Sequence, residues 1–274
     1  MEPNRQQPEP PPGLLQTADR ALQVLFMFDD RHTELGVTEV AEIMGINKSM
    51  SQRLLATLAY RGFLLVDANS RKYRIGPAAL TLGNTWKNSG SIQLIALPVM
   101  RQLSHRTGAT VILAVPDHGH MRVVSAVDGD TGPLRIQPLI GEMYPAHAGA
   151  TPKAYYAYLP PSQRQQLFVG RPVARFTPNT VTDIDSLEDE FHRIRSAGYA
   201  STVGEYDPHV ACVAVPVFLH GAPYASLSIA GPVESFTDPE HHLPALRTAS
   251  SQLERSLTGQ NPGGVPLRTN EEGA

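Results

Sequence analysis

The sequence predicts an α+β protein of two domains that are joined by a helix. Three observations lead to this prediction. Short helical patterns broken by glycines precede residue 88, hairpins of β-branched residues flanked by helices follow residue 91, and basic residues gather in one short segment of the first part. The expected boundaries are a disordered tail over 1–13, a first domain over 14–76, a linker helix over 77–90, a second domain over 91–258 and a disordered tail over 259–274.

The first domain begins with three helical patterns. Gly45 and Gly62 follow the second and third of them, as expected for glycines that end helices in a left-handed conformation. A polar residue able to cap a helix stands at the start of each pattern. The predicted helices are 14–28 with Thr17 as its cap, 39–44 capped by Thr38, and a third that is capped by Asn47 and ends near Tyr60.

A hairpin and a further helix complete the first part of the chain. Two short apolar runs, 63–66 and 72–75, flank the sequence Asp67-Ala68-Asn69-Ser70, which is typical of turns. Two short helices joined by a glycine turn form a helix-turn-helix, and the following hairpin makes it a winged one, whose second helix can enter the major groove of DNA. The segment 77–86 predicts a helix that links the two domains.

The second domain alternates amphipathic helices with β-branched runs. Asp117-His118-Gly119-His120 and His220-Gly221 are turn sequences, and each joins two runs into a hairpin. Hairpins flanked by helices indicate an antiparallel sheet. The expected helices are 92–106, 151–159, 162–169, 184–196 and 239–257, and the expected strands are 110–115, 121–127, 134–138, 210–218 and 224–229.

The charge of the chain is unevenly distributed. The formal net charge is −3, whereas the segment 47–87 holds seven basic residues and one acidic residue, a local charge of +6. The single cysteine, Cys212, excludes an internal disulfide and fits a reducing compartment. No run approaches the about 20 apolar residues of a membrane-spanning helix, and the proline-rich start lacks the apolar core of a signal peptide. We expect a cytoplasmic protein without a membrane partner.

The basic segment coincides with the third helix and the hairpin. Leu54, Leu55 and Leu58 form the buried stripe of that helix, so the polar residues near its start face outward. Glutamine and arginine can read base edges through paired hydrogen bonds, and basic residues on the hairpin suit phosphate contacts. A solvated polar surface is the alternative explanation. The predicted DNA contacts are Thr38, Lys48, Ser49, Met50, Gln52, Arg53, Arg71, Lys72 and Arg74.

Catalysis and metal binding have less support in the second domain. Cys212 with His147 or His209 suggests a thiol nucleophile, and His118 with His120 suggests metal ligands. Simpler explanations are a small buried cysteine on an apolar strand, a loop histidine bonded to the backbone, and two histidines in an exposed turn. We expect no enzymatic activity, no cofactor and no metal.

A binding pocket is predicted where the helix 151–159 begins. Thr151-Pro152 is the pattern of a helix cap followed by a first-turn proline, and the free amides of a helix start favour an anion. The three residues Ala148-Gly149-Ala150 before it are small, so a ligand can approach the backbone closely. An ordinary capped helix with no ligand is the alternative.

Short motifs spread along the chain match, in order, those of a known protein family. They are Ala18-Asp19-Arg20-Ala21-Leu22, Leu54-Leu55-Ala56-Thr57-Leu58, Tyr73-Arg74-Ile75-Gly76-Pro77, His147-Ala148, Leu159-Pro160, Phe176-Thr177-Pro178-Asn179-Thr180, Gly198-Tyr199-Ala200 and Ser228-Ile229-Ala230-Gly231-Pro232. On these motifs the chain resembles the IclR family of bacterial regulators from about Leu14 to Leu257. The resemblance implies a winged helix-turn-helix, a linker helix, an effector domain on a GAF-like sheet, and a dimer that is often paired into a tetramer.

The resemblance also implies effector contacts. Relatives that bind small carboxylates have a Gly-Ala pair, Asp, Cys, Ser and Ser at the effector-contact positions. In this chain only Cys212 and Ser228 agree with that set. The altered set favours a larger or more apolar acid. The recognition helix differs too, because Ser51 stands where the family usually has valine, so the operator cannot be inferred from relatives. The positions carried over are Ala150, Thr151, Thr202, Cys212, Ser228 and Ala230, to which we add Gly149 in the loop and Met143 as an apolar cover.

The sequence therefore predicts a DNA-binding transcriptional regulator. Its expected partners are a double-stranded operator, a small organic effector of acidic character, and a second copy of the chain, with a dimer of dimers as the larger assembly. Two alternatives stay open: an α+β enzyme with an accessory N-terminal domain, and a ligand-binding module that pairs with proteins. DNA binding that weakens steeply with salt favours the regulator, and turnover abolished by Cys212→Ala favours the enzyme.

Overall fold

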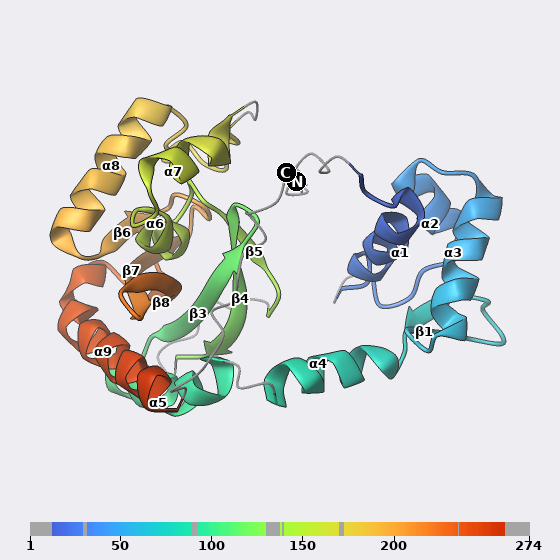
Figure 1. Ribbon diagram of the computed structural model, residues 1–274, viewed down its shortest axis with the longest axis horizontal. Coiled ribbons are helices and arrows are strands. Elements are labelled where there is room, and N and C mark those ends of the chain that lie inside the picture. Colours follow the sequence, from blue (N-terminus) through green and yellow to red (C-terminus); the bar gives the residue numbers. More distant parts are fainter. Residues whose placement is uncertain are drawn as a thin grey trace. The chain divides into compact units, whose positions relative to one another are not determined.

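The computed structural model describes residues 13–29, 32–88, 92–129, 138, 140–169, 173–234 and 236–260. By their internal contacts the residues fall into two compact units, Met1–Ser91 and Ile92–Ala274 (Figure 1). Within the described ranges, no helix combines the length and apolar character needed to cross a membrane.

The first unit is a small helical domain with a two-stranded hairpin. Its core is formed by Val24, Leu35, Leu55, Leu64 and Tyr73, which are all nearly inaccessible to solvent. The hairpin strands are antiparallel and pair Leu64 with Ile75. The elements are α1 (Gln16–Phe26), α2 (Val37–Met44), α3 (Lys48–Tyr60), β1 (Leu64–Val66), β2 (Tyr73–Ile75) and α4 (Ala78–Asn88).

The helix ends of this unit confirm some sequence predictions and correct others. Gly45 ends α2 in the left-handed region at φ 63°, and the Asn47 side chain caps α3 by accepting the Met50 N–H at 2.8 Å. The prediction that Thr38 caps the second helix is wrong, because the helix begins at Val37 and Gly36 occupies the cap position. Thr17 was likewise wrong as a cap, since it lies inside α1.

The second unit is built on a six-stranded antiparallel sheet of order β5-β4-β3-β8-β7-β6. The two predicted hairpins are confirmed, while the short edge strands β5 and β6 were missed by the sequence prediction. The predicted strand 134–138 lies mostly outside the described residues. The elements are α5 (Ile92–Thr107), β3 (Thr110–Asp117), β4 (His120–Val127), β5 (Met143–Pro145), α6 (Ala150–Tyr156), α7 (Pro161–Phe168), α8 (Ile184–Ala197), β6 (Ala200–Val203), β7 (Val210–Leu219), β8 (Ala222–Pro232), a short 3-10 helix η1 (Pro239–His242) and α9 (Leu243–Gln260).

Helices cover both faces of this sheet. Alternation along β3 sends Val111 and Leu113 into one core, beneath α5 and α9, and Ile112 and Ala114 into the other, beneath α6 and α8. Figure 1 shows α5 and α9 on one side of the sheet and α6 and α8 on the other. The arrangement confirms the predicted α+β class.

Candidate functional site

The predicted DNA contacts of the first unit are spread over α3 and the hairpin. Near the start of α3, the side chains of Lys48, Ser49, Gln52 and Arg53 are exposed. The hairpin exposes Arg71 and Arg74, and Thr38 is exposed on α2. The outward face of α3 is therefore polar and basic, as its apolar stripe predicts.

Several of these side chains also make contacts inside the unit. Gln52 Nε2 donates to the Tyr73 hydroxyl at 3.2 Å, and Arg20 Nη1 donates to the Met50 sulfur at 2.9 Å. Lys72 Nζ is 3.0 Å from a Glu39 carboxylate oxygen. These contacts join α3 and the hairpin to the rest of the unit, so the polar face is held in a defined position.

Ser51 has a structural role on the other side of α3. It is fully buried, and its hydroxyl donates to the Val37 carbonyl at 2.8 Å. This hydrogen bond ties the start of α2 to α3. The small hydroxyl that the sequence placed at a core position is accommodated by this bond.

The turn of the hairpin is fixed by Asp67. Its carboxylate accepts the Ser70 N–H at 2.7 Å and the Asn69 N–H at 3.0 Å, and these hydrogen bonds hold the pKa of Asp67 below its usual value. The following residue of the turn, Arg71, has a positive φ of 55°. A rigid turn of this kind presents Arg71 and Arg74 in a fixed geometry.

The second unit contains a cavity of about 400 Å³ at the start of α6. Six of the eight predicted effector contacts line it, namely Gly149, Ala150, Thr151, Thr202, Cys212 and Ala230. Ala148 and Pro152 of the predicted pocket motif also line it. The sequence prediction missed the rest of the wall, which comes largely from loops and strand ends with no recognisable motif. The further lining residues are Ile112, Pro138, Glu142, Tyr144, Ala148, Pro152, Glu205, Tyr206, Asp207, His209, Val210, Pro232 and Glu234.

Two small polar side chains, those of Thr151 and Cys212, form the floor of the cavity. The Thr151 hydroxyl donates to Ser228 Oγ at 2.8 Å and lies 3.7 Å from the Cys212 sulfur. Ser228 is fully buried beneath Thr151 and does not line the cavity. Burial raises the pKa of Cys212 to about 11, so the group is a protonated thiol at neutral pH and not a thiolate nucleophile.

The start of α6 differs from the sequence prediction. Gly149, at φ 93°, is the cap residue instead of Thr151, which lies inside the helix. The Gly149 N–H donates to Glu205 Oε2 at 2.9 Å, and the Ala150 N–H donates to the Thr202 hydroxyl at 3.0 Å. The first two amides of the observed helix start are thus bonded to side chains of the protein.

A buried ion cluster supports this arrangement from below. Lys153 is fully buried, and its ammonium contacts Glu205 Oε1 and lies 2.7 Å from Glu190 Oε2. Burial raises the pKa of Glu205, while Lys153 and the Gly149 amide oppose that rise. Glu205 therefore connects the lysine, the helix start and the cavity wall.

Two aromatic rings, those of Tyr144 and Tyr206, line the cavity and belong to a larger aromatic cluster. Tyr144 and Tyr206 meet edge to face with their centroids 5.2 Å apart, and Tyr206 contacts Phe176 at 4.9 Å. His147 stacks on Phe176 at 5.8 Å and donates through Nε2 to the Ala174 carbonyl at 2.8 Å. Burial lowers the pKa of His147, so this imidazole is a neutral packing group.

Met143 does not cover the cavity as predicted. Its sulfur accepts from Arg122 Nη2 at 3.0 Å, on the face of the sheet opposite Tyr144. Because successive side chains of a strand point to opposite faces, the neighbour Tyr144 takes the covering position. The prediction was off by one residue on a strand that the sequence had not revealed.

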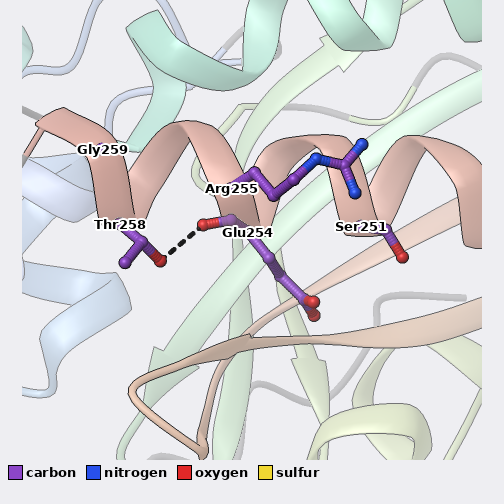
Figure 2. Close-up of a pocket in the computed structure, with 5 residues that line it drawn as sticks. All are labelled: Ser251, Glu254, Arg255, Thr258 and Gly259. Atoms are coloured by element: carbon purple, nitrogen blue, oxygen red, sulfur yellow. Dashed lines mark hydrogen bonds between the residues drawn. The ribbon is translucent and has the colours of Figure 1, made fainter.

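A second hollow in this unit is less suited to binding a ligand. An open hollow lies on α9, lined by Ser251, Glu254, Arg255, Thr258 and Gly259 (Figure 2). The Thr258 hydroxyl there donates to the Glu254 carbonyl at 2.8 Å, so it serves its own helix. No cluster of His, Cys, Asp or Glu with metal-binding geometry occurs among the described residues.

Two protein-family descriptions match this chain. "IclR helix-turn-helix domain" matches residues 17–68, and "Bacterial transcriptional regulator IclR C-terminal" matches residues 87–255. The HTH-type transcriptional regulator XynR of Escherichia coli strain K12 is 31% identical, over 89% of this chain and 98% of that protein.

Solved structures show the same fold. An IclR transcriptional regulator from Alicyclobacillus acidocaldarius has a TM-score of 0.79 and 25% identity, covering 89% of this chain and 99% of that chain. An IclR homolog from Microbacterium hydrocarbonoxydans, solved in complex with 4-hydroxybenzoate, has a TM-score of 0.77 and 23% identity over 89% of this chain and 99% of that chain. At that identity the second likeness speaks for the fold alone.

Proposed function

Since the chain belongs to the IclR family of bacterial transcriptional regulators, we propose how its two units divide the work of a DNA-binding regulator. The first unit contacts a double-stranded operator, and the cavity of the second receives a small organic acid that changes operator affinity. The observation that carries the effector half is the cavity itself, because about 400 Å³ is a volume suited to small molecules.

The proposed DNA contacts divide by role. Lys48, Ser49, Gln52 and Arg53 near the start of α3 read base edges, together with the half-buried Met50 beside them. Arg71, Lys72 and Arg74 of the hairpin and Thr38 of α2 contact phosphates and fix the position of the domain on the duplex. The exposure and charge of these residues support the assignment.

An operator selected from a random DNA pool tests this division. Arg53→Ala should weaken binding by about 1–3 kcal/mol and relax the base preference at one position, because a base contact is lost. Arg71→Ala should weaken binding to all sequences alike and reduce the salt slope by about one unit. Arg193→Ala on α8 is the matched control and should change neither. Unchanged affinity in both hairpin and helix variants would contradict the assignment.

The lining of the cavity favours a ligand with one acid group and an apolar body. The Thr202 hydroxyl accepts the Ala150 N–H and keeps its own hydrogen to donate to a carboxylate oxygen. Cys212 is uncharged and so does not repel an anion. Tyr144 and Tyr206 offer apolar area to the rest of the molecule.

Calorimetry with a panel of organic acids, starting with 4-hydroxybenzoate, tests the effector site. Val210→Phe should fill the cavity and abolish binding, since Val210 lines it and is only partly buried. Val203→Phe adds the same ring on the neighbouring strand outside the cavity and should leave binding intact. An acid that alters operator affinity and binds both variants equally would move the effector site elsewhere.

We further propose that the protein is a cytoplasmic homodimer without catalytic activity. A recognition helix covers only half of a near-palindromic operator, which favours a two-fold dimer. Large apolar side chains stay exposed on two helices of the first unit, Leu22 and Phe26 on α1 and Leu80 on α4. The family consists of regulators, and the protonated thiol of Cys212 supports the absence of thiol chemistry.

A further inference from the structure

One hydrogen bond joins the exposed face of α3 to the hairpin of the first unit. Gln52 of α3 is exposed, and its Nε2 donates to the hydroxyl of Tyr73 on β2 at 3.2 Å. Lys48 and Ser49 stand four and three residues before Gln52, so these three side chains share one face of the helix. Gln52 thus belongs to the proposed base-reading face and is also bonded to the hairpin.

Tyr73 is fixed in the structure by its ring and by its backbone. The residue is only 5% exposed and packs in the core of the unit. Its backbone pairs with Val66 of β1 on one side and with Leu35 on the other. The Leu35 N–H donates to the Tyr73 carbonyl at 2.9 Å, and the Tyr73 N–H donates to the Leu35 carbonyl at 2.8 Å. The hydroxyl to which Gln52 donates therefore has a defined position.

A long exposed side chain must be ordered before it can read a base. Gln52 would lose rotamer freedom when a base pair fixes its amide, and this loss opposes binding. The hydrogen bond to Tyr73 restricts the side chain before DNA is bound, so that less freedom is lost on the operator. The contact between α3 and β2 thus preorganises Gln52 for recognition.

The same hydrogen bond limits what the Gln52 amide can recognise. A glutamine amide has two N–H groups and one carbonyl oxygen. One N–H is donated to Tyr73, which leaves the second N–H and Oε1. In the major groove adenine presents an acceptor, N7, beside a donor, the N6 amino group, whereas guanine presents two acceptors, N7 and O6. The remaining pair of groups on Gln52 therefore complements adenine and not guanine.

The neighbours of Tyr73 connect this recognition to the DNA backbone. Lys72 and Arg74 stand directly before and after it, and both are proposed phosphate contacts. Phosphate contacts set the register of a protein on the duplex. A tyrosine between two such contacts is held at a set position relative to the base pairs, and so is the glutamine bonded to it.

We propose that Tyr73 is a positioning residue for base reading, whose hydroxyl holds Gln52 so that its amide recognises an adenine of the operator. The inference rests on the proposed function, in which the start of α3 reads base edges. It adds the base that Gln52 recognises and the residue that sets this preference. Tyr73 acts through Gln52 and does not itself read the DNA.

Operators selected from a random DNA pool by the full-length protein test the inference. The position at which Gln52→Ala loses its base preference identifies the base that Gln52 contacts. There the original protein should prefer adenine to guanine by at least about tenfold, as expected for a pair of hydrogen bonds to one base. A preference for another base at that position would overturn the inference and leave base reading by α3 in place.

Tyr73→Phe removes the hydroxyl and keeps the ring in the core. The preference for adenine should fall below about threefold, because the amide is then free to turn its second N–H toward guanine. Preferences at other positions and the salt slope should stay, since the phosphate contacts are kept. Adding Tyr73→Phe to Gln52→Ala should cause no further loss, as the two residues act through one bond. Tyr60→Phe removes a hydroxyl from the 82% exposed tyrosine at the end of α3 and should change nothing.

The outcomes separate this inference from the proposed function. A Tyr73→Phe variant that is unfolded by circular dichroism, or that loses affinity equally for all sequences, would overturn the inference, because the hydroxyl would then have a structural role. An unchanged adenine preference in the folded variant would overturn it too. If Arg53→Ala changes a base preference and Gln52→Ala changes none, the inference alone fails. If neither variant changes any preference, base reading by the start of α3 fails with it.

Discussion

Lys153 is the residue on which the cavity most depends. A fully buried ammonium is stable only with opposite charges beside it, and Glu205 and Glu190 supply them. Glu205 in turn accepts the Gly149 N–H at the start of α6, so one lysine positions both the helix start and a cavity wall. A buried charged cluster thus shapes one wall of the cavity.

Replacing Lys153 should destabilise the second unit strongly. Lys153→Met leaves two carboxylates without their partner, and breaking a buried ion pair in this way costs about 3–5 kcal/mol. Lys72→Met is the matched control, because Lys72 pairs with Glu39 in an exposed ion pair whose loss costs about 0–1 kcal/mol. Urea unfolding of both variants measures the difference. Equal losses would show that burial does not govern the cluster.

Single residues of the cavity were only partly predictable from sequence. The small residues and hydroxyls around Thr151 were found because a motif and a family resemblance pointed there. Tyr144, Tyr206 and Glu205 were missed, since side chains in loops and in a three-residue strand reach a cavity through tertiary contacts that leave no periodic signal. Met143 was predicted for its apolar character. Because side chains alternate along a strand, its neighbour Tyr144 lies at the cavity instead.

At the scale of elements, helices with a clear apolar stripe were predicted within a few residues, but only one of their four predicted caps was correct. Asn47 caps α3 through its side chain, and Thr38, Thr17 and Thr151 do not cap their helices. Leu15, Gly36 and Gly149 hold those cap positions. At the start of α6, side chains from other elements accept the Gly149 and Ala150 N–H groups. The strands β5 and β6, of three and four residues, are too short to show alternation.

The two candidate caps of the first unit should respond differently to alanine. Asn47→Ala should lower the stability of the unit by about 1 kcal/mol, because the Met50 N–H loses its acceptor. Thr38→Ala should leave stability unchanged, as Thr38 makes no cap bond, and should lower affinity for DNA instead. Thermal unfolding and operator binding of both variants measure this. A loss of stability in Thr38→Ala would contradict this prediction and show that Thr38 has a structural role.

The start of α2 should make the first unit sensitive to acid. The Gly36 N–H and the Lys72 ammonium hold the pKa of Glu39 below its usual value of 4.5. A carboxyl whose pKa is lowered by folding adds stability above its unfolded pKa, and this is lost as pH falls through the folded value. The free energy of unfolding should therefore fall as the pH drops below 4.5. The fall should be smaller in Glu39→Gln, and the difference between the two proteins should be at most about 1 kcal/mol at this exposed site. Circular dichroism measures the unfolding of both proteins as a function of pH. Identical curves for the two proteins would contradict this prediction.

At the scale of the whole molecule, regulation requires coupling between two units with separate cores. An effector changes operator affinity only if it binds the free and DNA-bound states with different affinities. Each unit was predictable as a fold because its own hydrophobic pattern is complete, with Leu55 central to one core and Leu227 to another. The coupling between the two units leaves no such local pattern in the sequence. The proposed dimer contacts are the part of it that can be tested.

The proposed dimer should depend on the exposed apolar residues along α1 and at its cap. Leu15, Leu22 and Phe26 recur at spacings of seven and four residues, which places them on one helix face, and each is more than half exposed. Leu22→Glu with Phe26→Glu should turn the dimer into monomers and weaken operator binding at least about a hundredfold, because each monomer then holds one half-site only. Val169→Glu introduces a charge at an equally exposed apolar residue of the second unit and should alter neither property. Light scattering at micromolar concentration and operator titration measure both. A double variant that remains dimeric and binds the operator as tightly as the original would place the two-fold contact on another surface.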